Sequence, residues 1–100
     1  MCGIIGIASN KLVASNIIQS LKKLEYRGYD SAGIATIVNG EINEKKCTGR
    51  VDNLEKMLFK SPSKGSLGIG HVRWATHGTP SQVNAHPHSS EEVSIVHNGI

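Results

Sequence analysis

The chain has 100 residues, a formal net charge of +3 and a charged content of 19%, which suits a globular protein of one domain at most. Aromatic residues make up only 4%, which speaks against stacking platforms for nucleic acid, and the lysines are scattered as on a solvated surface. Two cysteines are too few for a disulfide framework, and no signal peptide or membrane-spanning run is present in the sequence. We therefore expect a protein of the reducing cytoplasm, with no nucleic-acid or membrane partner.

The pattern of apolar residues predicts a mixed α and β chain without repeats. In chain order we expect a strand over 3–8, a helix over 12–24, a polar loop over 29–33, strands over 34–38 and 41–47 joined by Asn39-Gly40, a helix over 51–59, a strand over 67–74, a long loop over 75–90 and a strand over 93–97. The first strand reads as buried on both faces, and Asn-Gly favours a type I′ hairpin. In the strand over 67–74, His71 and Arg73 share one face.

The first candidate for chemistry is Cys2, directly behind the initiator methionine. If Met1 is removed, Cys2 carries a thiol and a free α-amine on one carbon. An α-amine titrates near ~7.7–8.0, against ~10.4 for a lysine, so at neutral pH it is far more often a free base. Such a residue is a nucleophile with a built-in base. The alternative is a small buried cysteine at the start of a strand.

Polar groups also gather at the ends of the later strands. Arg73 can offer two parallel donors to a carboxylate, although an ordinary surface arginine is the alternative. Asn98-Gly99 can aim a side-chain N–H and a backbone N–H at one oxygen, which is what an oxyanion hole requires, but Asn-Gly is also a common turn. The loop over 75–90 is long for so small a domain, and such loops are usually functional or disordered.

Five histidines raise the question of a metal, and His86, His88 and His97 define the alternative of a small metal-binding module. No HExxH or CxxC spacing is present, so we predict no metal. No Walker A or GxGxxG motif is present either, and we predict no cofactor.

Five motifs in order then carry a resemblance: Cys2-Gly3-Ile4-Ile5-Gly6, Tyr26 to Ala35 (YRGYDSAGIA), His71 to Gly78 (HVRWATHG), Asn84 to His88 (NAHPH) and His97-Asn98-Gly99-Ile100. Together they closely resemble the start of the glutamine–fructose-6-phosphate aminotransferase (glucosamine-6-phosphate synthase) family, and the match covers essentially the whole chain. The wider group is the class II glutamine amidotransferases. Amidophosphoribosyltransferases in that group usually differ where this chain has Tyr29 and Trp74-Ala75-Thr76-His77.

The resemblance implies an α+β fold, the αββα sandwich of the N-terminal nucleophile (Ntn) hydrolases. It also implies that Met1 is removed, that the Cys2 thiolate attacks the carboxamide of glutamine, and that Asn98 and the Gly99 N–H hold the oxyanion. The expected glutamine-binding residues are Arg73, Trp74, Thr76, His77 and His86, with Trp74 in a loop that closes over the site and gates ammonia passage. Arg27 is expected to support the nucleophile.

Two parts of the family's machinery lie outside residues 1–100: an aspartate that grips the glutamine α-amino group, and the isomerase region that receives the ammonia. We therefore expect the chain to be the N-terminal part of a glutaminase domain, with an incomplete sandwich and no sugar isomerase domains. Fructose 6-phosphate would be a substrate only through the missing region of a homo-oligomeric enzyme. The alternative is a truncated, non-catalytic remnant of that enzyme.

Overall fold

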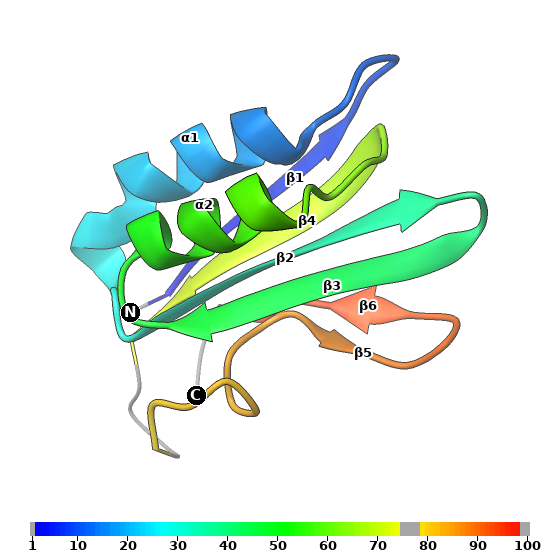
Figure 1. Cartoon of the computed structure of the whole chain (residues 1–100). Coiled ribbons are helices and arrows are strands. Elements are labelled where there is room, and N and C mark those ends of the chain that lie inside the picture. The colour runs from blue at the N-terminus through cyan, green and yellow to red at the C-terminus, as the bar shows by residue number, and fades with distance from the viewer. Residues whose placement is uncertain (1, 75–78, 99–100) are drawn as a thin grey trace.

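The computed structural model describes residues 2–74 and 79–98. Its main sheet has four strands in the order β1-β4-β2-β3, and every neighbouring pair is antiparallel. The strands are β1 (Gly3–Ala8), β2 (Ser31–Val38), β3 (Glu41–Thr48) and β4 (Leu67–Arg73). Figure 1 shows α1 (Ala14–Leu24) and α2 (Val51–Lys60) side by side on one face of this sheet. The short strands β5 (His88–Ser89) and β6 (Ser94–Ile95) form a separate hairpin on the other side.

The hydrophobic core lies between the helices and the sheet. Both helices follow the predicted amphipathic pattern, and their apolar stripes are buried against the central strands. The fully or nearly fully buried members of this cluster are Val13, Ile17, Ile18, Leu21, Ala32, Ile34, Val51, Leu54 and Val72. Each large apolar side chain buried in this way contributes about 1.5–3 kcal/mol, so this layer supplies most of the fold's stabilisation.

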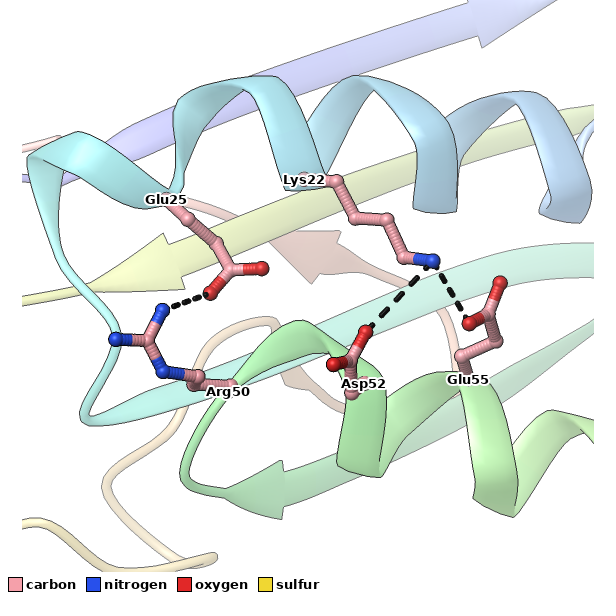
Figure 2. Close-up of polar contacts among 5 residues, drawn as sticks. All are labelled: Lys22, Glu25, Arg50, Asp52 and Glu55. Atoms are coloured by element: carbon pink, nitrogen blue, oxygen red, sulfur yellow. Dashed lines mark hydrogen bonds and ion pairs between the residues drawn. The ribbon is translucent and has the colours of Figure 1, made fainter.

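Ion pairs link the two helical segments along their solvent-facing edge (Figure 2). Lys22 Nζ lies 2.8 Å from Glu55 Oε1 and 3.7 Å from Asp52 Oδ1. The hydrogen bond to Glu55 raises the pKa of Lys22. Arg50, just before α2, pairs with Glu25 across 3.2 Å. Because most of these side chains remain partly exposed, we expect each pair to contribute little to stability.

The Asn39-Gly40 hairpin is confirmed, because both residues have positive φ angles, 52° and 78°, as a type I′ turn requires. The predicted alternation in β4 also holds. Gly70 faces Ile17 and Leu21 of α1, whereas His71 points to the other side, where it meets His97.

Three expectations were wrong. The strand β1 is not buried on both faces: it lies at the sheet edge, and Ile4 on the face away from the helices is 46% exposed. The strand β2 begins at Ser31 rather than Ile34, because the small residues 31–33 pair with both β3 and β4. The segment 75–90 is not all loop, since its end forms β5, and the last strand is shortened to Ser94–Ile95.

Candidate active site

Cys2 and Asn98 meet although they lie at opposite ends of the chain. The Cys2 backbone nitrogen donates a hydrogen bond to Asn98 Oδ1 over 3.3 Å. This nitrogen is a peptide amide here and stands in for the α-amine that removal of Met1 would create. Cys2 is only 4% exposed, which would also fit the alternative of a small buried cysteine with a purely structural role. Asn98 is exposed. The contact with Asn98 is the feature that a purely structural cysteine would not need.

The direction of this hydrogen bond orients the Asn98 amide. Since Oδ1 accepts from Cys2, the Nδ2 donors project from the other side of the same planar group. Donors held beside a nucleophile are what an oxyanion requires. Gly99, the second predicted donor, lies outside the described residues, as does Met1.

Arg73 ends β4 and is 8% exposed, so it is not the ordinary surface arginine that the sequence left open. Its Nη1 donates to the Thr79 carbonyl oxygen over 3.3 Å, and Asn84 Nδ2 donates to the same oxygen over 2.9 Å. These bonds fold the 79–84 turn over the end of the strand. A guanidinium held in this way is suited to a carboxylate, because its planar donors keep a fixed direction.

Trp74 follows directly and is 48% exposed. Its ring meets Tyr29 edge-on, with the centroids 5.9 Å apart, and Arg50 lies over the Tyr29 ring at 4.4 Å. Tyr29, Asp30, Trp74 and Pro80 line a pocket of about 290 Å³. The sequence predicted Trp74 as a site residue but not the other three lining residues, although Tyr29 and Asp30 stand in one of the five motifs. Thr76 and His77 lie outside the described residues.

The 28–30 segment reaches this pocket because Gly28 lets two backbones touch. A Cβ at Gly28 would lie 2.7 Å from the carbonyl group of Arg73 and from the Trp74 nitrogen. The Asp30 N–H then donates to the Arg73 carbonyl oxygen over 3.1 Å. Arg27 itself turns to its neighbour: its Nε donates to the Tyr26 hydroxyl over 3.1 Å, and its guanidinium lies over that ring. Its support of the nucleophile stays a prediction.

Three histidine rings from different segments pack against one another beside the His97 backbone, which directly precedes Asn98. The rings of His71 and His86 lie 4.3 Å apart and nearly parallel, and His88 leans on His86 at 4.5 Å. His71 Nε2 lies 2.8 Å from the His97 carbonyl oxygen, and the His97 N–H donates to His86 Nδ1 over 3.3 Å. Burial lowers the pKa of His71, and burial together with the neighbouring positive groups lowers the pKa of His86 to about 4.

Within residues 2–74 and 79–98, no group of three or more histidine, cysteine or acidic side chains could hold a metal ion. The alternative of a metal module built on His86, His88 and His97 therefore gains no support from the described residues. The same residues contain no helix long and apolar enough to cross a membrane.

Comparison with known proteins returned no matching family model but many similar sequences. The chain is 57% identical over 100 residues to the glutamine–fructose-6-phosphate aminotransferase [isomerizing] of Mesorhizobium japonicum, and 60% identical to that of Bartonella quintana. The corresponding protein of Clostridium acetobutylicum is 56% identical over 102 residues. The chain is related to the glutamine–fructose-6-phosphate aminotransferases. Each alignment covers the whole chain, which spans only 16–17% of the length of these relatives.

Among solved structures, the glutamine phosphoribosylpyrophosphate amidotransferase of B. subtilis, complexed with ADP and GMP, matches with a TM-score of 0.75 and 26% identity. The match covers 94% of this chain and 20% of that one. The predicted fold class is therefore confirmed: the chain has the fold of an Ntn-type glutamine amidotransferase. Its one helical layer and antiparallel sheets are compatible with an incomplete αββα sandwich.

Proposed function

We propose that this chain carries the glutaminase centre of an aminotransferase that uses glutamine as its nitrogen donor. The observation that carries the proposal is the 3.3 Å contact between the Cys2 nitrogen and Asn98 Oδ1. It joins the predicted nucleophile and the predicted oxyanion donor, which are 96 positions apart in the sequence. The similarity to glutamine–fructose-6-phosphate aminotransferases along the whole chain supports the same conclusion.

Removal of Met1 would turn the Cys2 nitrogen into an α-amine. That amine takes the thiol proton, directly or through a water molecule, and the thiolate attacks the carboxamide carbon of glutamine. The Asn98 side chain and the Gly99 N–H stabilise the oxyanion that forms. In enzymes of this kind, loss of one such donor typically lowers the rate by about 10²–10³-fold. Protonation of the leaving nitrogen releases ammonia and leaves a glutamyl thioester. Water then hydrolyses the thioester to glutamate and restores the thiol.

The remaining predicted residues bind and enclose the substrate. Arg73 pairs with the α-carboxylate of glutamine, and Trp74 closes over the bound molecule from its half-exposed position beside Tyr29. Thr76, His77 and His86 line the site in this proposal, and Arg27 supports the nucleophile. No metal or cofactor takes part.

The fate of the ammonia is the second half of the proposal. In the complete enzyme, assembled as a homo-oligomer in the cytoplasm, a region beyond residues 1–100 would use it to convert fructose 6-phosphate to glucosamine 6-phosphate. The names of the relatives support this assignment, because each is a glutamine–fructose-6-phosphate aminotransferase.

The deciding experiment measures glutamate release from glutamine by the purified protein, with an intact mass that reports whether Met1 has been lost. We expect release that disappears in Cys2→Ala, with a fall of at least about 10³-fold because the nucleophile itself is gone. Since alanine is small and apolar, circular dichroism should show an unchanged fold. No release from a folded protein that has lost Met1 and includes the part of the domain beyond residue 100 would contradict the proposal. No release from residues 1–100 alone would favour the truncated, non-catalytic remnant.

A further inference from the structure

The backbone of His97 is held from both sides by side chains. The strand β6 ends at Ile95, so its ladder with β5 no longer supplies partners at residue 97. Instead, His71 from β4 lies 2.8 Å from the His97 carbonyl oxygen, and His86 from the segment before β5 accepts the His97 N–H over 3.3 Å. The backbone N–H and C=O of His97 are thus both hydrogen-bonded to imidazole rings. We call this arrangement of His71 and His86 around the His97 backbone the histidine clamp.

The clamp fixes the protonation of one nitrogen in each ring. A carbonyl oxygen only accepts, so His71 Nε2 must carry a proton, and His86 Nδ1 must be unprotonated to accept from an N–H. Both rings can therefore be neutral, and neutral rings can stack at 4.3 Å where two imidazolium ions would repel. Burial of both rings lowers their pKa values and favours the same state.

The clamp is itself anchored on the sheet. His71 is fully buried within β4. The His86 backbone lies directly over Gly33 of β2, where any Cβ would overlap the His86 carbonyl oxygen. The two rings therefore attach the segment that carries Asn98 to the two central strands, β4 and β2.

Asn98 is the next residue after the clamp, and its Oδ1 accepts from the Cys2 nitrogen. Because Asn98 is exposed, packing alone does not fix its side chain. We propose that His71 and His86 are positioning residues, which clamp the His97 backbone so that the Asn98 amide is held toward Cys2. This inference rests on the proposed function of Asn98 as an oxyanion donor. It gives His86 a role behind the site, in addition to the substrate contact expected from the resemblance.

The test uses matched substitutions in the whole protein. His86→Phe keeps a flat ring for stacking but removes the acceptor, whereas His86→Asn places an amide oxygen close to the position of Nδ1. His88→Phe is the control, because it makes the same change in a ring that touches His86 but is not one of the two rings that bond the His97 backbone. Circular dichroism confirms that each variant is folded.

The first measurement is hydrogen exchange of the His97 backbone amide, followed by NMR. We expect His86→Phe to speed this exchange by about tenfold or more, as the loss of a protecting hydrogen bond should. His86→Asn should restore much of the protection, and His88→Phe should leave it unchanged. Unchanged exchange in His86→Phe would overturn the clamp whether or not the protein hydrolyses glutamine.

The second measurement is the kinetics of glutamate release. A misplaced donor lowers kcat, so we expect His86→Phe to lose about 10- to 10²-fold in kcat with a much smaller change in KM, and His86→Asn to recover most of it. A loss of His97 protection without a loss of kcat would overturn the positioning role. An absence of Cys2-dependent release in the unsubstituted protein would instead contradict the proposed function, and the exchange experiment would still decide the clamp.

Discussion

The helix-covered face of the sheet and the face that carries the site are held together in different ways. On the first, α1 and α2 bury an apolar stripe against the central strands, and Ile17, Leu21 and Leu54 are fully buried. On the second, His71 of β4 lies 2.8 Å from the His97 carbonyl oxygen, 26 positions further along the chain, and Arg73 of the same strand donates to Thr79 in the turn that follows it. One face depends on the amount of apolar area that is buried, and the other on the direction of a few polar bonds. Substitutions on the helix-covered face should therefore lower stability, whereas substitutions on the other face should mainly change glutamine binding and turnover.

The largest effect on stability is expected on the helix-covered face. Ile17→Ala removes a side chain with no exposed surface and leaves a cavity between α1 and β4, which should cost about 2–5 kcal/mol in the free energy of unfolding. Urea denaturation measures this cost. At temperatures where the variant remains folded, its KM for glutamine should stay near that of the unsubstituted protein. A variant as stable as the parent would show that the helices contribute less than their burial indicates.

A smaller effect, mainly on binding, is expected for Arg73→Lys. Lysine keeps the positive charge but loses the planar pair of donors, so we expect KM for glutamine to rise about 10- to 100-fold. Glutamate release at varied glutamine concentration gives this value. An unchanged KM would remove Arg73 from the proposed binding site. Arg50→Lys is the matched control, because Arg50 pairs with Glu25 and lies over Tyr29 rather than at the strand end.

The smallest effect is expected from pH. The pKa of His86 is lowered to about 4 from the ordinary 6.5, so the unfolded chain takes up a proton before the folded one does. The neutral His86 ring makes its full contribution to the free energy of unfolding above pH 6.5, and this contribution falls as the pH drops toward 4. His71, His88, His97 and Arg73 are the positive or titratable groups that lower this pKa along with burial. His71, whose pKa is lowered too, acts in the same direction.

Urea midpoints between pH 7 and pH 4 test this dependence. Because His86 is only half-buried, solvent screens the effect, and we expect a gradual fall rather than a sharp transition. In His86→Asn, part of this fall should disappear, while a comparable slope in both proteins would assign the pH dependence to other groups.

The two faces also differ in how far sequence alone could predict them. Periodicity located both helices to within two residues at each end, because an amphipathic stripe is a local pattern. Asn39-Gly40 identified its hairpin for the same reason. The start of β2 was missed because Ser31, Ala32 and Gly33 have the composition of a loop. Only their pairing with two neighbouring strands makes them part of the sheet.

At the site, the sequence predicted which residues carry the chemistry but not which of them contact one another. The motifs selected Cys2, Arg73 and Asn98, and the structure brings the first and last of these into contact. The partnership of His71 with the His97 backbone was not predicted, because it depends on the path of the chain after β6. A useful local signal was nevertheless present: His71 lies two residues before Arg73, on the same face of β4.

The contact of the Cys2 nitrogen with Asn98 bears on how the protein can be tagged. A fusion partner or affinity tag placed before residue 2 would keep this nitrogen as an amide, which has no basic lone pair, and would silence the proposed chemistry without altering the fold. The tip of the β2–β3 hairpin offers another attachment point. It lies at the far end of the sheet from the start of β1 (Figure 1), and both of its residues, Asn39 and Gly40, are exposed. A label joined there would leave the nucleophile's amine free.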